Sequence, residues 1–230
     1  MRIGVPKEIK PQENRIGLTP ESVKSLTSNG HEVLIENNGG FQAGFDNEQY
    51  QSAGAKIIHS AEDIYNDAEI IVKVKEPLAN EVKMIRENQI VFTYLHLAAA
   101  KELTQGLIDS KSVCIAYETV TDNNGRLPLL APMSAVAGRM SVQAGAHCLE
   151  KNQNGRGILL GGAPGGEPGN VVILGGGVVG ENAAIIATGM RAKVYVVDKS
   201  AERLKELTKI FGDKIIPKLS DETDIEKLIP

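Results

Sequence analysis

The stretch Val171-Val172-Ile173-Leu174-Gly175-Gly176-Gly177-Val178-Val179-Gly180 joins a short apolar run to a turn that is rich in glycine. Its glycines fit the pattern G-x-G-x-x-G, which is a weak indication when it stands alone. Here the apolar run predicts a strand, and residues 179–190 predict a helix directly after the turn. A second predicted strand, residues 193–197, is followed by Asp198 at the expected offset of about 20 residues. The stretch therefore predicts a strand–turn–helix–strand unit that binds a dinucleotide.

Each residue of this unit has a physical task in the prediction. Gly175 permits the tight turn, Gly177 lets the backbone approach a pyrophosphate, and Gly180 lets the helix pack close to the strand. The helix N-terminus offers unpaired N–H groups and a partial positive charge to the phosphates. Asp198 can accept hydrogen bonds from both ribose hydroxyls and would repel a 2′-phosphate, so NAD is favoured over NADP. The alternative is a glycine-rich turn in another α/β fold.

Strands and helices alternate along the rest of the chain. Thr19 and Pro20 predict the start of a helix and Gly30 its end, while Asp46 predicts the cap of a second, short helix. Continuous apolar runs are typical of parallel strands that are buried on both faces. We predict an α/β fold in which a parallel-sheet substrate domain precedes the first half of a Rossmann NAD-binding domain. The predicted strands are residues 2–5, 31–35, 56–58, 70–74, 90–94, 113–116, 171–174, 193–197 and 214–216, and the longer helices are residues 101–110, 133–150, 179–190 and 201–211.

The composition argues against several classes of protein. The 230 residues carry a formal net charge of −4, which gives no electrostatic case for binding nucleic acid or an anionic membrane. The longest apolar runs are too short to cross a bilayer, and the N-terminus lacks the apolar segment of a signal peptide. Cys114 and Cys148 show no metal-ligand spacing and are predicted to be free, buried thiols. We therefore expect a cytoplasmic protein without a metal site.

Six further blocks of sequence stand out beyond the glycine turn. They are GVPKE at residues 4–8, NRIGLTP at 14–20, VKVKEP at 72–77, YLHLA at 94–98, AYET at 116–119 and LLAPMS at 129–134. Together they resemble the family of alanine dehydrogenase and the nucleotide-binding part of proton-translocating transhydrogenase, over essentially the whole chain. The histidine in Leu95-His96-Leu97-Ala98 resembles alanine dehydrogenase, because transhydrogenase is not expected to keep a histidine there.

The resemblance implies roles for individual residues. Arg15 matches the arginine that grips the substrate carboxylate, Lys75 the lysine that binds the keto or imino side of the substrate, and His96 the catalytic acid/base. The implied reaction is the reversible oxidative deamination of L-alanine to pyruvate and ammonium. In it a hydride passes from the α-carbon to NAD, water attacks the imine, and ammonia leaves. The positions implied to contact NAD are Ser134, Val178, Val179, Asp198, Arg203 and Ser220.

Elementary chemistry agrees with these roles, although each residue also has a structural alternative. An arginine fork holds a carboxylate in one orientation, and imidazole carries protons near neutral pH. Arg15 could instead form a surface ion pair in a loop, and His96 could cap the helix that follows it. Lys73 lies two residues before Lys75, and strand alternation would place both on one face. The pattern alone therefore does not choose between the two lysines.

The resemblance also implies that family members are longer than this chain. The remaining part would supply the second half of the nucleotide-binding sheet and a catalytic aspartate. We expect about three strands of a fold that usually has six, with an exposed apolar edge and an uncovered face. The predicted domains are residues 1–130 for the substrate and residues 131–230 for NAD, the latter incomplete. The alternatives are a transhydrogenase subunit and an inactive truncated remnant, and the resemblance implies a homo-oligomer, in the family a hexamer.

Overall fold

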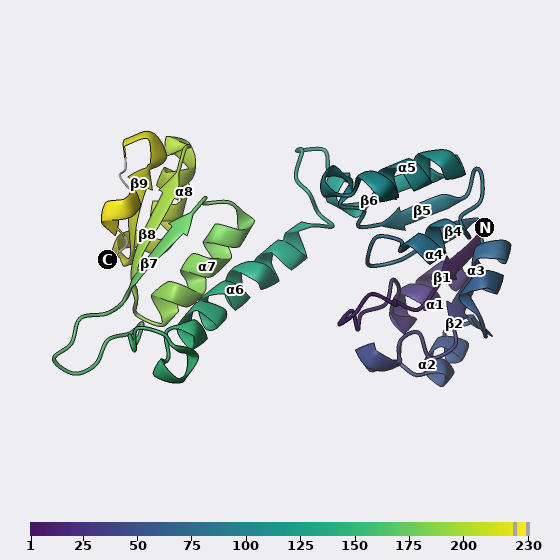
Figure 1. Cartoon of the computed structure of the whole chain (residues 1–230), viewed down its shortest axis with the longest axis horizontal. Coiled ribbons are helices and arrows are strands. Elements are labelled where there is room, and N and C mark those ends of the chain that lie inside the picture. Colours follow the sequence, from purple (N-terminus) through teal and green to yellow (C-terminus); the bar gives the residue numbers. More distant parts are fainter. Residues whose placement is uncertain (223–224, 229–230) are drawn as a thin grey trace. The chain divides into compact units, whose positions relative to one another are not determined.

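The structure is a computed structural model that describes residues 1–222 and 225–228 (Figure 1). The chain divides into two compact units, Met1–Leu127 and Pro128–Pro230, which we call unit 1 and unit 2. In the part of the chain that the structure describes, no helix combines the length and the apolar character that a membrane span requires.

Unit 1 is built on a six-stranded sheet. Its strands are β1 (Arg2–Val5), β2 (Glu32–Glu36), β3 (Lys56–Ile58), β4 (Ile70–Val72), β5 (Ile90–Thr93) and β6 (Val113–Ala116). They are all parallel and lie in the order β3-β2-β1-β4-β5-β6, which confirms the predicted α/β class (Figure 1). The chain order thus reverses between β1 and β4. In open α/β sheets, ligands bind beyond the carboxyl ends of the strands at such a point.

The helices of unit 1 begin at capping residues. The hydroxyl of Thr19 accepts a hydrogen bond from the N–H of Ser22 at 3.3 Å, and Asp46 forms the predicted cap of a short helix. The prediction missed the helix Ala61–Asp67, because seven residues show too little periodicity, although Ser60 caps it. The elements are α1 (Pro20–Ser28), α2 (Asn47–Ser52), α3 (Ala61–Asp67), α4 (Ala79–Val82) and α5 (Lys101–Ser110), with 3-10 turns η1 (Phe41–Ala43), η2 (Leu97–Ala99) and η3 (Tyr117–Thr119).

Apolar side chains cover both faces of this sheet. On β2, Val33 and Ile35 pack into one buried cluster, whereas Leu34 between them packs into the other. A Cβ added to Gly4 would lie 2.6 Å from the side chain of Ile64, so α3 packs directly on β1. Burial on both faces is the reason why these strands are continuous apolar runs in the sequence. The core therefore holds the strand ends in fixed positions.

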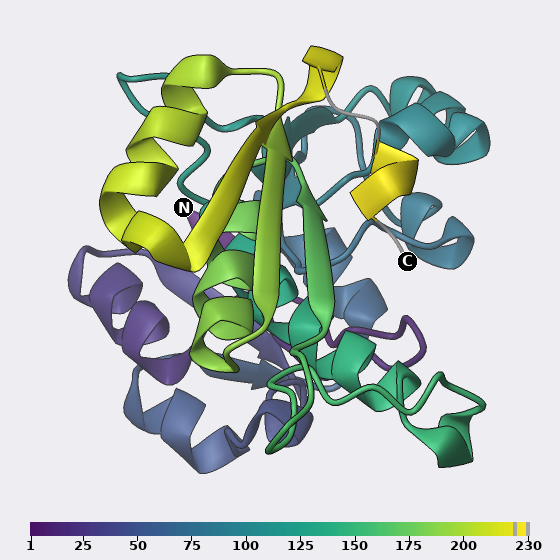
Figure 2. The ribbon, with the colours of Figure 1, turned by 90° about the vertical axis from the view of Figure 1, so that its left-hand side faces the viewer.

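Unit 2 is built on three parallel strands in the order β7-β8-β9. The strands are β7 (Asn170–Leu174), β8 (Lys193–Asp198) and β9 (Ile215–Leu219), and the helices are α6 (Ala131–Cys148), α7 (Val178–Gly189) and α8 (Ala201–Phe211), with 3-10 turns η4 (Lys151–Gln153), η5 (Gly212–Lys214), η6 (Ser220–Glu222) and η7 (Ile225–Leu228). Figure 2 shows the three strands side by side, with α7 behind them and α8 to the left of β9. Helix α6 packs closely on α7, because a Cβ on Gly138 would lie 2.2 Å from the carbonyl oxygen of Val179.

The near face of this sheet in Figure 2 carries no helix from the described residues of unit 2. Leu174, on the edge strand β7, is 65% exposed, whereas its neighbour Ile173 is 7% exposed and packs in the core with Val196. Alternation along the strand explains the contrast, since successive side chains point to opposite faces. Within the described residues of unit 2, the expectation of an exposed apolar edge is confirmed, and no α-helix of this unit covers the near face of the sheet.

The other predicted elements differ from the structure mainly at their ends. The predicted strand 31–35 is shifted by one residue, and the predicted strand 70–74 ends at Val72. Both cysteines are free, as predicted, but the expected burial is wrong for Cys148. Cys148 is the last residue of α6 and is exposed.

Candidate functional site

The carboxyl ends of neighbouring strands bring functional groups to one edge of the unit 1 sheet. Lys75 follows β4 and His96 follows β5, and parallel neighbours end at the same edge. Arg15 lies in the loop between β1 and α1. This loop runs against the end of β4, because a Cβ on Gly17 would lie 2.7 Å from the carbonyl oxygen of Val72. The sheet order thus brings a guanidinium, an ammonium and an imidazole to adjacent strand ends.

Arg15 forms a two-point ion pair with Glu13. Its Nε donates to Oε1 at 2.8 Å and its Nη2 donates to Oε2 at 2.6 Å. These hydrogen bonds lower the pKa of Glu13 to about 2, and the charge of Lys75 contributes in the same direction. The ion pair that the sequence left open is therefore present, with the Arg15 side chain 48% exposed. A guanidinium has five N–H donors, so a fork oriented by one carboxylate can still receive a second.

This ion pair makes stability depend on pH in a defined range. Because the pKa of Glu13 is lowered from 4.5 to about 2 by folding, its contribution is complete above about pH 4.5 and is lost as the pH falls towards about 2. We expect Glu13→Gln to reduce the free energy of unfolding most near neutral pH and progressively less below about pH 4.5. Urea unfolding of both proteins across this range measures the difference. A difference that does not change with pH would contradict the expectation.

The structure separates Lys73 from Lys75. Lys73 is 1% exposed, and its ammonium lies 3.2 Å from a carboxylate oxygen of Glu8 and 2.7 Å from one of Glu81. Lys75 is half-buried at the sheet edge. The alternation expected for a longer strand does not apply, because β4 ends at Val72, before either lysine. Lys73 is therefore a buried structural lysine, and Lys75 is the lysine placed at the edge.

His96 lies in a turn of unusual backbone conformation. Its φ of +52° is in the left-handed region, which non-glycine residues rarely adopt. Glu118 stabilises the turn, because its carboxylate accepts the N–H of His96 at 2.7 Å and that of Leu95 at 3.1 Å. The His96 side chain makes no capping hydrogen bond to the following turn, so the capping alternative is wrong. The conformation instead leaves the imidazole about half exposed at the sheet edge.

The imidazole of His96 has two side-chain neighbours. Its Nδ1 lies 3.3 Å from Oε2 of Glu76, and its ring stacks on Tyr94 with 6.0 Å between the ring centroids. Glu76 also forms an ion pair with Lys10. Burial raises the pKa of Glu76, but the hydrogen bonds from Lys10 and His96 outweigh it, and the pKa lies below its ordinary value. An ionised carboxylate beside Nδ1 favours the tautomer that carries its proton there, which leaves Nε2 as the proton acceptor.

A cavity of about 480 Å³ opens beside this histidine. Of the three predicted substrate residues, His96 lines it, and neither Arg15 nor Lys75 does. Its walls are largely apolar. The lining residues are Leu95, His96, Leu97, Ala98, Ala99, Ala116, Glu118 and Thr119.

The glycine turn of unit 2 has the geometry that its pattern predicts. Gly175 has a φ of +92°, and a Cβ on Gly180 would lie 1.9 Å from the Gly175 carbonyl oxygen. The turn therefore folds back on the first turn of α7. A Cβ on Gly177 would meet no atom within 4 Å, so space is open at the start of this helix. No side chain caps α7 at Gly177, and its first N–H groups are available to an anion.

Asp198 and Arg203 bracket the same turn. Asp198 accepts the N–H of Gly176 at 2.6 Å and that of Ser200 at 2.8 Å, and these hydrogen bonds lower its pKa. Arg203 Nε donates to the carbonyl oxygen of Gly176 at 2.7 Å, and its guanidinium also pairs with Glu181. The Asp198 carboxylate is therefore ionised at the end of β8. Asp198 and Arg203 thus bind the N–H and the carbonyl oxygen of the same residue, Gly176.

The remaining predicted cofactor residues lie on three elements of unit 2. Val178 and Val179 begin α7, and both side chains are exposed. Ser134 lies on α6, one helical turn before Gly138, which contacts α7. Ser220 directly follows Leu219, which pairs with Asp198 across the sheet. The predicted residues Ser134, Gly175, Gly177, Val178, Val179, Gly180, Asp198, Arg203 and Ser220 thus come from the elements around the glycine turn.

Sequence reasoning missed several groups that surround the predicted substrate residues. Glu8, Glu76, Tyr94 and Glu118 each contact the backbone or side chain of a predicted site residue or its neighbour. All four lie within four residues after the end of a strand. Polar residues directly after apolar strands were the signal that could have found them.

The two units define a class of protein. The chain combines a parallel sheet that carries polar and charged groups at its carboxyl edge with a Rossmann-type half-sheet that carries a G-x-G-x-x-G turn, as in two-domain nucleotide-dependent enzymes. The family described as Alanine dehydrogenase/PNT, N-terminal domain, matches residues 4–137, and the corresponding C-terminal domain matches residues 141–230. The chain belongs to the alanine dehydrogenase/PNT family.

Named relatives of known sequence share about half of its residues. The alanine dehydrogenase of Methanococcus maripaludis is 51% identical over the whole chain, which covers 61% of that relative. The alanine dehydrogenase of Bacillus subtilis is 53% identical over 98% of the chain and 59% of its own length. The chain thus spans about three fifths of the length of these curated relatives.

Solved structures give the same comparison in three dimensions. An L-alanine dehydrogenase superposes with a TM-score of 0.91 at 52% identity, over 99% of this chain and 63% of that one. A transhydrogenase from Sinorhizobium meliloti has a TM-score of 0.77 at 24% identity, over 94% of this chain and 64% of that one. At that identity the second likeness concerns the fold alone.

Proposed function

We propose that the protein catalyses the reversible, NAD-dependent oxidative deamination of L-alanine to pyruvate and ammonium. The observation that supports the proposal most directly is that Arg15, Lys75 and His96 lie in the loops that follow β1, β4 and β5, three neighbouring parallel strands. Arg15 and Lys75 both lower the pKa of Glu13 through their charges. Tyr94 experiences the charge of Arg15 and stacks on His96. The relatives that carry the name alanine dehydrogenase support the same function.

The chemistry of the three side chains fits an α-amino acid and its keto acid. The guanidinium of Arg15 binds the substrate carboxylate in one orientation. Glu13 fixes the plane of this guanidinium through two hydrogen bonds. The ammonium of Lys75 donates to the keto oxygen of pyruvate and stabilises the charge that develops on it. Nε2 of His96 takes a proton from the water that adds to the imine, and returns it to the departing amine. Positioning and proton transfer thus come from unit 1.

The glycine turn fits a dinucleotide. The open space at Gly177 and the uncapped N-terminus of α7 suit the diphosphate, and the ionised Asp198 suits the hydroxyls of the adenosine ribose. The same carboxylate would repel a 2′-phosphate, so we propose NAD rather than NADP. When bound, NAD accepts the hydride from the substrate α-carbon.

Removing the Asp198 carboxylate should weaken NAD binding. Hydrogen bonds to a charged group contribute about 1.5–3 kcal/mol, so Asp198→Ala is expected to raise the Kd for NAD roughly 10- to 100-fold. Calorimetric titration with NAD measures the change. Glu202→Ala, which removes an exposed carboxylate from the first turn of α8, is the matched control and should leave the Kd unchanged. Equal affinities in all three proteins would rule out the assigned role of Asp198.

The decisive assay is NADH formation with L-alanine and NAD, measured for the 230-residue chain and for a full-length protein, by which we mean a form that extends to the length of the relatives. Turnover of about 1–10³ s⁻¹ that requires L-alanine would support the proposal. Hydride exchange between nucleotides without any need for L-alanine would support a transhydrogenase subunit instead. That alternative has less support, since the transhydrogenase likeness is limited to the fold. If the 230-residue chain by itself shows no activity of either kind, the inactive remnant is the better description of that chain.

We further propose that the protein acts in the cytoplasm as a homo-oligomer, which the family resemblance implies to be a hexamer. The free cysteines suit a reducing compartment. Light scattering coupled to size-exclusion chromatography of the full-length protein gives the oligomeric state directly. A monomer at micromolar concentration would contradict this part of the proposal.

A further inference from the structure

The backbone of Lys75 is held from both sides by side chains of neighbouring strands. Its N–H donates to Oε1 of Glu8 at 3.3 Å, and its carbonyl oxygen accepts from the hydroxyl of Thr93 at 2.9 Å. Glu8 follows β1 and Thr93 ends β5, the two strands on either side of β4. We propose that Glu8 and Thr93 are positioning residues that set the place of the Lys75 ammonium for the substrate. The inference rests on the role proposed above for Lys75.

The Glu8 side chain is buried and binds the backbone of this loop. It is 7% exposed, and its Oε1 also accepts the N–H of Val74 at 2.6 Å. One carboxylate oxygen therefore binds two successive N–H groups of the loop that carries Lys75. Hydrogen bonds to a charged acceptor are stronger than those between neutral groups. The loop is thereby tied to the end of β1, where the chain order of the sheet reverses.

A second buried ion pair keeps Glu8 in place. Its Oε2 lies 3.2 Å from the ammonium of Lys73, which in turn lies 2.7 Å from Glu81. Glu81 accepts the N–H of Leu78 at 2.8 Å and so fixes the far end of the same loop. Buried charges are costly unless they are paired and hydrogen-bonded, and here each has its partners. The two ion pairs that join Glu8, Lys73 and Glu81 therefore connect the start of this loop to its end.

Thr93 completes the arrangement on the other side. Its side chain is buried, and its hydroxyl reaches across from β5 to the carbonyl oxygen of Lys75. A lysine side chain has several rotatable bonds, so a fixed backbone is the first requirement for placing its ammonium. Displacement of a substrate-binding group by about 1 Å can cost 10²-fold in rate. Both contacts are therefore expected to affect catalysis as well as stability.

The test uses the full-length protein, with pyruvate, ammonium and NADH as substrates. Thr93→Val keeps the shape of the side chain and removes the hydrogen bond, and Glu8→Gln keeps one acceptor oxygen and removes the charge. We expect each to lower kcat/KM for pyruvate about 5- to 50-fold, chiefly through KM, with an unchanged Kd for NADH. Amide hydrogen exchange at Lys75 should become faster in both variants, because one of the two contacts to its backbone is lost in Thr93→Val and weakened in Glu8→Gln.

Two further variants make the outcomes distinct. Glu69→Gln is the matched control, because Glu69, just before β4, accepts the N–H of Arg2 at the start of β1 at 2.7 Å, at the opposite edge of the sheet. Its kcat/KM should stay within about twofold of the original protein.

Lys75→Ala tests whether Lys75 itself has the proposed role in substrate binding. If Lys75→Ala lowers kcat/KM but both positioning variants leave it unchanged, the inference fails and the proposed function stands. If Lys75→Ala has no effect, the proposed role of Lys75 fails, and the inference fails with it.

Discussion

Replacing His96 by alanine in the full-length protein is expected to lower kcat for L-alanine by about 10²–10⁴-fold, the usual contribution of a general acid/base. The imidazole lies at the carboxyl end of β5, with Nδ1 beside the carboxylate of Glu76 and its ring on Tyr94. Nε2 is thereby the nitrogen that can take a proton from the attacking water. Without it, water has to lose its proton to solvent, and the leaving amine has no nearby donor.

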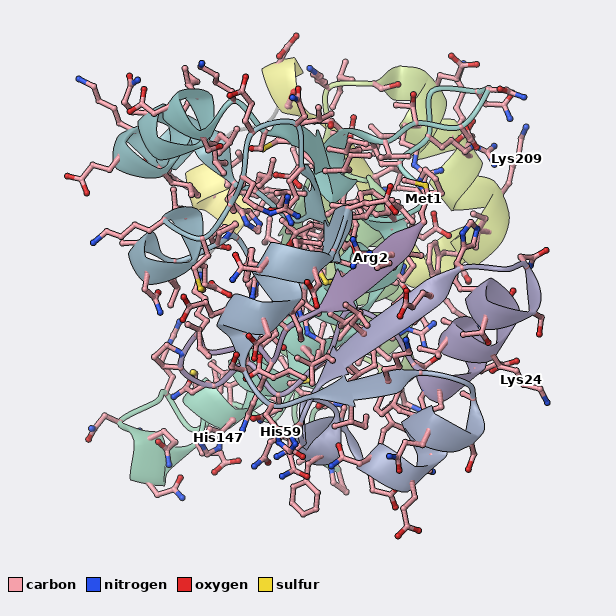
Figure 3. All side chains as sticks on the ribbon, turned by 90° about the vertical axis from the view of Figure 1, so that its right-hand side faces the viewer. Met1, Arg2, Lys24, His59, His147 and Lys209 are labelled. Atoms are coloured by element: carbon pink, nitrogen blue, oxygen red, sulfur yellow. The ribbon has the colours of Figure 1, made fainter. Side chains whose placement is uncertain are left out.

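Steady-state kinetics with L-alanine and NAD measure this loss, and calorimetry reports NAD binding separately. NAD affinity should persist, because the glycine turn belongs to a different unit from His96. His59→Ala is the control, since His59 is an exposed histidine that follows β3, away from the three site strands in the sheet order (Figure 3). A parallel loss of NAD binding in His96→Ala would show that the histidine is structural. Unchanged kcat would exclude it as the acid/base.

The second large effect is expected at the glycine turn, where two substitutions should act differently. In Gly177→Ala the new Cβ enters open space at an ordinary φ of −68°, so the fold should be retained. The same Cβ occupies the space proposed for the diphosphate, and the Kd for NAD should rise at least about tenfold. In Gly180→Ala the Cβ would lie 1.9 Å from the Gly175 carbonyl oxygen. This overlap should destabilise unit 2 by about 1–3 kcal/mol or more and should also impair NAD binding.

Thermal unfolding and NAD titration of the same three variants separate these effects. Gly189→Ala is the control, because a Cβ there meets no atom within 4 Å and lies at the far end of α7. We expect Gly177→Ala to lose affinity alone, Gly180→Ala to lose affinity and stability, and Gly189→Ala to lose neither. If Gly177→Ala bound NAD as tightly as the original protein, the diphosphate could not lie at this turn.

The sequence by itself determined the features that depend on near neighbours in the chain. Continuous apolar runs identified the buried strands, and caps such as Thr19 and Asp46 identified helix starts, because these contacts lie within four residues. The turn from Gly175 to Gly180 was recognisable for the same reason, since its close contact joins residues five apart. Residues 61–67 escaped because a short helix depends on packing against β1 more than on its own periodicity.

Only the tertiary structure decided how the site is assembled. Lys73 and Lys75 look alike in sequence, and they differ because Glu8, 65 residues before Lys73, and Glu81 hold Lys73 in the core. The orientation of Arg15 by Glu13 is local, whereas the close approach of the same loop to the end of β4 joins Gly17 to Val72, which is distant in the chain. The physical reason is sheet order. Parallel strands that are distant in the chain end at one edge, and which strands are neighbours follows from the packing of the whole sheet.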